Sequence, residues 1–140
     1  PGADEVHEFG TPQRFYEHMA ALVARWGGAA DLRGACGLSC VGAVVAPKDA
    51  ASTAALRSAL PYTPFLVPGY GAQGATAEGC RPCFLADGRG AVINASRSVI
   101  YAFGKSPYAE KHGADWQAAV AAACRAFAAD VGGLIESPRA

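Results

Sequence analysis

Apolar residues in the first quarter of the chain recur at helical spacing. The stripe consists of Phe15, Met19, Leu22, Val23 and Trp26. Thr11 followed by Pro12 has the pattern of a helix start, and the pair Gly27-Gly28 has that of a helix end. The sequence therefore predicts one amphipathic helix here, with the stripe facing the core.

Three short apolar runs further along predict strands, at residues 41–46, 65–67 and 91–95. The first is a continuous apolar run of the type that is buried on both faces. A helix is predicted between the first two, from a cap at Asp49 to about Leu60, just before a proline. Strands that alternate with helices in this way indicate parallel β-α units, and therefore an α/β fold.

The second half of the chain continues this alternation. Thr76 predicts the cap of a short helix. Residues 96–103 fit either a short helix or more strand, and residues 104–113 are expected to be irregular. Asp115 predicts the cap of a last helix that ends at Gly132-Gly133. The apolar face expected for this helix consists of Trp116, Val120, Ala123, Cys124, Phe127 and Val131.

Length and composition place the chain among globular domains. It has 140 residues, 51% of them hydrophobic, which fits a single domain over residues 1–140. A formal net charge of zero and the absence of a Lys/Arg run argue against nucleic acids and membranes as partners. No apolar run is expected to be long enough to span a membrane. Because the chain begins at Pro1 rather than Met, we expect a further segment upstream.

Five cysteines, an odd number, indicate reduced thiols and a cytoplasmic protein. Cys36 and Cys40, together with Cys80 and Cys83, have spacings that could supply four zinc ligands. Neither pair lies in a knuckle-like turn that a second hairpin follows. We therefore expect these cysteines to pack as small hydrophobic residues, and we expect no metal.

The loop after the second strand has the composition of an anion-binding loop. Gly69, Gly71 and Gly74 can adopt positive φ and let a ligand approach the backbone, and Gln73 is the one long polar side chain there. Arg97 follows the next strand, where a guanidinium suits bidentate binding of phosphate. The two strand ends together predict a phosphate site.

Two kinds of fold can present such a loop. Residues 69–74 fit G-x-G-x-x-G, which in a dinucleotide-binding domain holds pyrophosphate at the start of the next helix, and Arg97 could then bind a 2′-phosphate. Gly79 and Pro82 disfavour a regular helix there, so this segment is poorly suited to bind pyrophosphate at its N-terminus. In a (β/α)8 barrel, phosphate often binds in the loops after strands seven and eight. In that fold Ser96-Arg97 opens a short helix after the second loop.

The barrel interpretation agrees with a family resemblance. The segments FLVPGYGAQG and DGRGAVINASRSVIYA resemble the C-terminal part of orotidine 5'-phosphate decarboxylases, in the bacterial branch with LVPG-x-GAQGG and a later N-S-S-R run. PGA at the start of the chain resembles the segment after the fifth barrel strand, and VGAVV resembles the sixth strand. The resemblance implies about strands six to eight of a TIM barrel, with flanking helices.

The resemblance also implies roles for single residues. Gln73 and Arg97 match the side chains that grip the substrate phosphate. The other implied positions are backbone contacts to the phosphate at Gly71, Ala72 and Ser96, and substrate-pocket positions beside the pyrimidine and ribose at Pro68, Gly69 and Tyr70.

The sequence departs from the family pattern in several places. Tyr70 stands where the family usually has a small aliphatic residue. Ala46-Pro47-Lys48 replaces the usual Gly-Ala-Thr, and Ala75 replaces the second Gly of the family motif. The family's catalytic Lys/Asp array belongs to the second and third strands, and a Ser that contacts the pyrimidine amide would precede Pro1. No position here matches these residues. The lysines considered and not assigned, because none stands in a D-x-K-x-x-D context, are Lys48, Lys105 and Lys111.

The resemblance implies a lyase that converts orotidine 5'-phosphate to uridine 5'-phosphate and CO2 in pyrimidine biosynthesis, without a cofactor. This chain would hold the phosphate, require the N-terminal half of the barrel as its partner and be inactive alone. A cytoplasmic homodimer is expected. Two alternatives stay open: an NADP-dependent oxidoreductase domain that uses GYGAQG as its dinucleotide loop, and a half-barrel that binds phosphate without chemistry.

Overall fold

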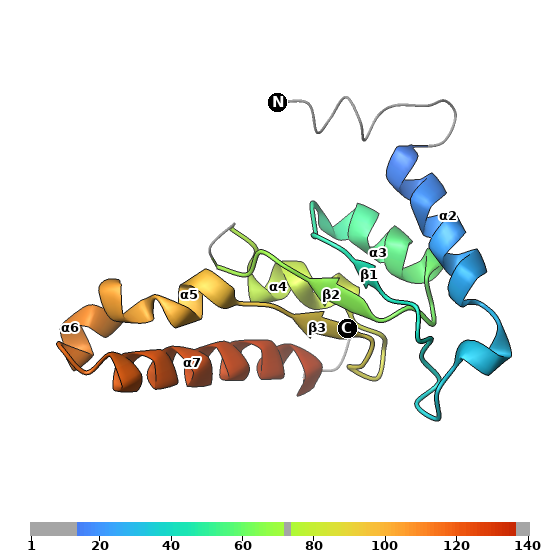
Figure 1. Ribbon diagram of the computed structural model, residues 1–140. Coiled ribbons are helices and arrows are strands. Elements are labelled where there is room, and N and C mark those ends of the chain that lie inside the picture. The colour runs from blue at the N-terminus through green and yellow to red at the C-terminus, as the bar shows by residue number, and fades with distance from the viewer. Residues whose placement is uncertain (1–13, 72–73, 137–140) are drawn as a thin grey trace.

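The computed structural model describes residues 14–71 and 74–136. Its centre is a three-stranded parallel sheet in the order β1-β2-β3 (Figure 1). The strands are β1 (Ala43–Val44), β2 (Phe65–Val67) and β3 (Ala91–Ile93). All three predicted strands and their parallel pairing are confirmed, although β1 and β3 are shorter than the runs that predicted them.

Helices alternate with these strands. Before β3 lie α2 (Phe15–Gly27), α3 (Ala50–Ala59) and the short α4 (Ala77–Cys80). After β3 come α5 (Ser96–Ile100), α6 (Tyr108–His112) and α7 (Trp116–Glu136). Single turns of 3-10 helix occupy Ala30–Leu32, Arg81–Cys83 and Ala102–Gly104. The alternation predicted from the sequence is therefore confirmed, and the sheet and helices form an α/β architecture.

Three predicted helix starts are confirmed by their hydrogen bonds. The side chains of Asp49, Thr76 and Asp115 each accept a hydrogen bond from the backbone N–H three residues further on, at 2.8, 3.1 and 2.9 Å. Such a bond satisfies one of the N–H groups that a helix start leaves without a partner. The predicted start of α2 at Thr11 lies outside the described residues.

Two predictions about the end of the chain are wrong. Residues 104–113 contain α6, which packs against α7 and is not irregular. α7 also continues through Gly132-Gly133 to Glu136. The continuation has a packing reason, because the side chain of Ile135 lies against the Gly88 turn so closely that a Cβ there would collide with it.

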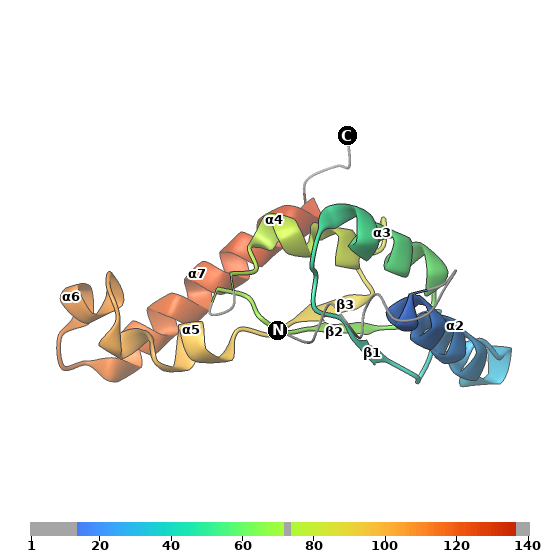
Figure 2. The ribbon, with the colours of Figure 1, turned by 90° about the horizontal axis from the view of Figure 1, so that it is seen from above.

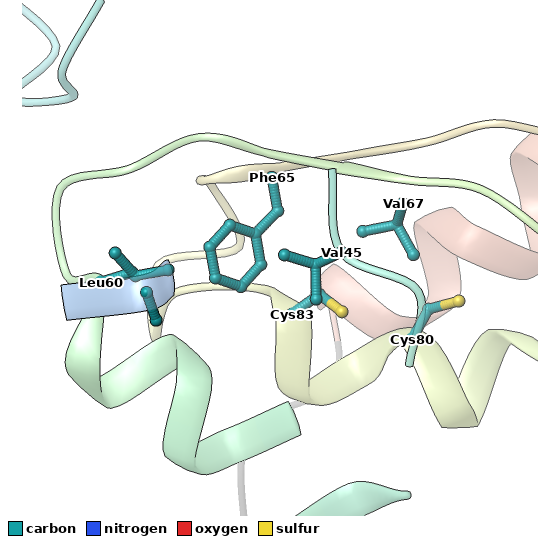
Figure 3. Close-up of a cluster of buried hydrophobic side chains, with 7 residues drawn as sticks. Val45, Leu60, Phe65, Val67, Cys80 and Cys83 are labelled. Carbon is teal, nitrogen blue, oxygen red and sulfur yellow. The ribbon is translucent and has the colours of Figure 1, made fainter. Parts of the chain in front are cut away.

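The described helices cover one face of the sheet. Figure 2 shows α3, α4 and α7 on the same side of the three strands. Phe65 and Val67 of β2 point to this side and are 1% and 0% exposed. They form the main core together with Ala20, Val45, Leu60, Cys80 and Cys83 (Figure 3).

No described helix covers the other face, so the prediction that the strand at residues 41–46 is buried on both faces is wrong for the described residues. Val44, Leu66 and Val92 are in register across the three strands and are 70%, 44% and 64% exposed. Successive strand residues point to opposite faces, so this apolar row lies on the side away from the helices. In a closed barrel that side is the interior, and side chains from all the strands fill it.

The apolar stripe of α2 does not lie fully in the core, contrary to the prediction. Phe15, Met19 and Trp26 are 44%, 37% and 52% exposed, whereas Ala20 is buried. A groove of about 760 Å³ runs between α2, α3 and β1, and Phe15, Met19 and Val23 are among its lining residues. β1 is an edge strand, so within the described sheet no strand lies on its outer side to cover this stripe.

The buried face of α7 agrees with the predicted one in part. Ala123 is buried, and Val120 and Phe127 pack against the same cluster, as predicted. Trp116 and Cys124 are exposed, contrary to the prediction, and Ala119 is buried without having been predicted.

The segment Trp116–Ile135 also has the length and composition of a membrane span, with a mean hydropathy of 1.5, which corrects the expectation that no apolar run reaches that length. A single helix of this kind is weak evidence, because core helices of globular proteins meet the same criteria. Only 11% of this segment is buried.

Candidate functional site

Two connections leave the carboxyl ends of β2 and β3 side by side. β2 continues into the glycine loop that starts at Pro68, and β3 continues through Asn94 and Ala95 into α5 (Figure 1). Neighbouring parallel strands end at the same edge of a sheet, so the two connections share that edge. In α/β folds the carboxyl edge of a parallel sheet is where ligands bind.

Three glycines determine the shape of the loop after β2. Gly69, Gly71 and Gly74 have φ angles of 100°, 69° and 85°, in a region that other residues rarely adopt. The N–H of Gly71 donates to the carbonyl of Ala75 at 2.9 Å. A Cβ on Gly71 would lie 3.1 Å from the Cβ of Ser98, so glycine also permits close approach of α5. The positive φ angles predicted for these glycines are confirmed.

Arg97 lies in the first turn of α5 and is exposed. Within the described part of the chain, no residue makes a hydrogen bond or ion pair with its guanidinium. The next residue, Ser98, donates its hydroxyl to the carbonyl of Tyr70 at 3.4 Å. At the start of the helix, the Ser96 hydroxyl donates to Asn94 Oδ1 at 3.1 Å. The turn that carries Arg97 therefore lies directly against the glycine loop.

Two of the residues assigned to the phosphate, Ala72 and Gln73, lie outside the described residues. Their contacts stay predictions, as do the ligand contacts of Gly71, Ser96 and Arg97. Pro68 and Gly69 are half-buried at the start of the loop, beside the site. Their position is compatible with the predicted pocket wall, which also stays a prediction.

The side chain of Tyr70 is directed to α7. Its ring packs on Phe127 with the two ring centroids 4.8 Å apart, and its hydroxyl donates to the carboxylate of Asp130. Burial, followed by the hydrogen bond to Asp130, raises the pKa of Tyr70 to about 12. The sequence analysis missed these contacts, because no local pattern connects Tyr70 to residues so much further along the chain.

The helix after the loop argues against a dinucleotide site. α4 begins at Ala77, after its cap Thr76, and contains four residues before a 3-10 turn that includes Pro82. In a dinucleotide-binding fold the glycine loop leads into a long helix whose N-terminus faces the pyrophosphate. The described geometry therefore favours the barrel interpretation of the loop.

The cysteines do not gather into a metal site among the described residues, where no three His, Cys, Asp or Glu side chains come together. Cys36 and Cys40 are exposed, near the isolated strand pair that Arg33 forms with Ser39, so the expectation that they pack as small hydrophobic residues is wrong. Cys80 and Cys83 are instead buried beneath the sheet, where they pack as the sequence predicted.

A buried guanidinium that the sequence analysis also missed lies at the opposite edge of the sheet. Arg57 of α3 is 7% exposed and lies 3.8 Å above the ring of Phe65. It donates to the backbone carbonyls of Leu60, Thr63, Cys83 and Gly90. These bonds join α3 to the segments that enter β2 and β3, away from the glycine loop.

Comparison with family models gives no match. Two curated proteins named orotidine 5'-phosphate decarboxylase are similar to the chain. One, from Rhodopirellula baltica, is 40% identical over 84 residues, which cover 59% of this chain and 28% of that protein. The other, from Clostridium novyi, is 33% identical over 114 residues, which cover 80% of this chain and 39% of that protein. The chain thus spans 28% and 39% of the lengths of these relatives.

A solved structure shows the fold. The chain aligns with the OMP decarboxylase of Leishmania donovani at a TM-score of 0.59 and 21% identity, over 97% of this chain and 44% of that one. The three parallel strands and their helices are therefore a segment of a TIM barrel. The chain is a homologue, over part of their length, of the orotidine 5'-phosphate decarboxylases, and its partial coverage fits a C-terminal portion of them.

Proposed function

We propose that this chain is the phosphate-binding portion of an orotidine 5'-phosphate decarboxylase, a carbon–carbon lyase that forms uridine 5'-phosphate and CO2 in pyrimidine biosynthesis. One observation carries the proposal. The exposed Arg97 lies on a helix turn that Ser98 ties to the glycine loop, in a chain whose relatives bear that name. An exposed guanidinium beside a glycine loop, at the carboxyl edge of parallel strands, is an arrangement that suits a phosphate dianion.

The substrate phosphate would lie between the glycine loop and α5. The proposed contacts are the side chains of Gln73 and Arg97 and the backbone of Gly71, Ala72 and Ser96. Pro68 and Gly69 would form the wall beside the ribose and the pyrimidine. Binding of this remote group supplies free energy that positions the reacting ring in the rest of the enzyme. The Lys and Asp residues that act on the carboxylate are expected in the N-terminal portion.

We also propose that residues 1–140 form one partial domain that needs the N-terminal portion of the same barrel. The exposed row of Val44, Leu66 and Val92 supports this, because it would become barrel interior. The groove between α2, α3 and β1 gives further support. A strand that precedes α2 and runs parallel to β1 would fill that groove by an ordinary right-handed crossover.

Following the family resemblance, we propose that the assembled enzyme is a cytoplasmic homodimer that uses no cofactor. Uridine 5'-phosphate is then the product that leaves the site. A half-barrel that binds phosphate and takes no part in catalysis stays a competing proposal. A complementation assay, in which the chain is mixed with an N-terminal portion and turnover is measured, distinguishes this proposal from the decarboxylase.

An Arg97→Ala variant tests the phosphate role in an enzyme assembled from this chain and an N-terminal portion. We expect the variant to bind uridine 5'-phosphate more weakly by about 1.5–3 kcal/mol, or roughly 10- to 150-fold, because it loses a charged hydrogen bond. Uridine, which has no phosphate, should bind equally to both forms. Calorimetric titration measures both affinities.

Arg25→Ala is the matched control, because Arg25 is also exposed but lies at the far end of α2. It should leave both affinities unchanged. An equal loss of uridine and nucleotide affinity in Arg97→Ala would show that Arg97 has another role. Tighter binding of NADP than of uridine 5'-phosphate would instead support the dinucleotide alternative.

A further inference from the structure

Tyr70 connects the glycine loop to the last helix of the chain. Its ring packs on Phe127 of α7, and its hydroxyl donates to the Asp130 carboxylate on the same helix. Neither Phe127 nor Asp130 belongs to the set of residues proposed to touch the phosphate. The loop after β2 is therefore held by a helix residue, Asp130, that follows Tyr70 by 60 positions in the chain.

The backbone of the same residue is held by α5. The carbonyl of Tyr70 accepts a hydrogen bond from the Ser98 hydroxyl at 3.4 Å. The N–H of Gly71 is engaged by Ala75 at 2.9 Å, inside the loop. Tyr70 and Gly71 thus lie between α7 and the helix that carries Arg97.

Such attachment matters in a glycine loop, because glycine loses more conformational entropy on ordering than any other residue. A loop that is ordered before the ligand arrives does not lose that entropy on binding, and its affinity is higher. The Tyr70 hydroxyl is a donor at neutral pH, as any tyrosine is, and burial and Asp130 raise its pKa further, to about 12. Its acceptor is a carboxylate, and such hydrogen bonds are stronger than neutral ones.

We propose that Tyr70 is a positioning residue, with Asp130 as its partner on α7, and that the pair holds Gly71 beside Arg97 in the conformation that binds phosphate. This inference rests on the proposed function. It also assigns Tyr70 a role other than the pocket wall that the family resemblance implied. Tyr70 acts through the loop backbone and does not itself contact the substrate.

The test uses the assembled enzyme and three variants: Tyr70→Phe, Asp130→Ala and the double variant. Tyr70→Phe keeps the ring on Phe127 and removes only the hydroxyl. We expect each variant to bind uridine 5'-phosphate about five- to tenfold more weakly, with uridine affinity changed less than twofold. The double variant should be no weaker than the single ones, because all three lose one hydrogen bond.

Two further variants complete the design. Asp130→Asn keeps an acceptor oxygen and should recover most of the nucleotide affinity. Tyr101→Phe is the control, because it removes the hydroxyl of an exposed tyrosine at the C-terminal end of α5, and it should bind both ligands as the parent does. Thermal midpoints measured on all variants show any loss of fold stability.

Unchanged nucleotide affinity in Tyr70→Phe overturns the inference. An equal loss of nucleotide and uridine affinity, accompanied by a lower thermal midpoint, also overturns it, because that pattern indicates a structural role alone. Arg97→Ala, titrated in parallel, identifies which statement has failed. If Arg97→Ala selectively loses the nucleotide and Tyr70→Phe does not, the positioning role is wrong and the proposed function stands. If Arg97→Ala loses nothing, both are wrong.

Discussion

The five cysteines fall into two chemical classes according to their burial. Cys80 and Cys83 are fully buried, and burial raises the pKa of both thiols, that of Cys83 to about 11. Cys36, Cys40 and Cys124 are exposed. A thiolate is the form that reacts with an alkylating reagent, so a raised pKa and a lack of access both suppress the reaction.

We therefore predict that iodoacetamide at pH 8 labels the three exposed cysteines of the folded protein and leaves Cys80 and Cys83 unlabelled. Peptide mass spectrometry measures the labelling at each site. In denaturant all five should react, because the burial that raises the two pKa values is lost. Labelling of Cys83 in the folded protein as fast as that of Cys36 would contradict the burial of this pair.

For single residues, contacts with near neighbours in the sequence were predictable, whereas contacts with residues in other elements were not. The caps at Asp49, Thr76 and Asp115 depend on backbone groups three residues away, so their pattern is visible in the sequence. The positions of Arg57 and Tyr70 depend on partners in other elements. Nothing in the local sequence around an arginine on a helix or a tyrosine in a loop indicates partners in other elements. The contacts of Arg57 and Tyr70 were therefore not predicted.

At the scale of elements, Arg57 holds α3 against the entries to β2 and β3. Its guanidinium donates to four buried carbonyls and stacks on Phe65. Replacing it with Lys keeps the charge but removes the planar, five-donor group that reaches several acceptors at once. Buried carbonyls then lose their partners, which is costly.

We predict that Arg57→Lys lowers the free energy of unfolding of the assembled protein by about 2–3 kcal/mol. Guanidinium chloride unfolding measures the change. Arg25→Lys is the matched control on an exposed helix end, and it should change stability by less than about 0.5 kcal/mol. Equal stability of the two variants would show that the Arg57 contacts are not needed. Nucleotide affinity should be unchanged in Arg57→Lys, because Arg57 lies at the opposite edge from the glycine loop.

The limits of elements were harder to predict than their existence. Gly132-Gly133 has the composition of a helix end, yet α7 continues because Ile135 packs on the Gly88 turn. α6 was missed because its five residues are too few to show a helical period. The two errors have different causes: packing against another element decided where α7 ends, whereas α6 is too short to show a helical pattern.

At the scale of the whole molecule, alternation predicted the parallel sheet, and the resemblance to a family predicted that the sheet is part of a barrel. Periodicity alone identifies which face of an element is apolar, but not what covers that face. The stripe of α2 was therefore expected in the core, whereas Phe15 and Met19 are exposed along a groove that the edge strand β1 also lines. The row of Val44, Leu66 and Val92 is exposed for the same reason: the sequence shows that these residues are apolar, but not what covers them.

The central claim is that this chain supplies the residues that bind the substrate phosphate, and that the catalytic groups come from the N-terminal portion of the barrel. Phosphate binding by itself stabilises the ground state and the transition state about equally, so it does not accelerate the reaction. The sheet formed by the described residues is also open, with β1 and β3 as its edge strands, which favours aggregation or pairing with a complement.

The most direct test measures the loss of orotidine 5'-phosphate absorbance with the purified 140-residue chain, alone and after mixing with the N-terminal portion of the Clostridium novyi relative. We predict no turnover by the chain alone, turnover in the mixture, and loss of that turnover at low substrate concentration when the chain carries Arg97→Ala. Substantial turnover by the chain alone would contradict the claim, because it would place the catalytic residues within these 140 residues.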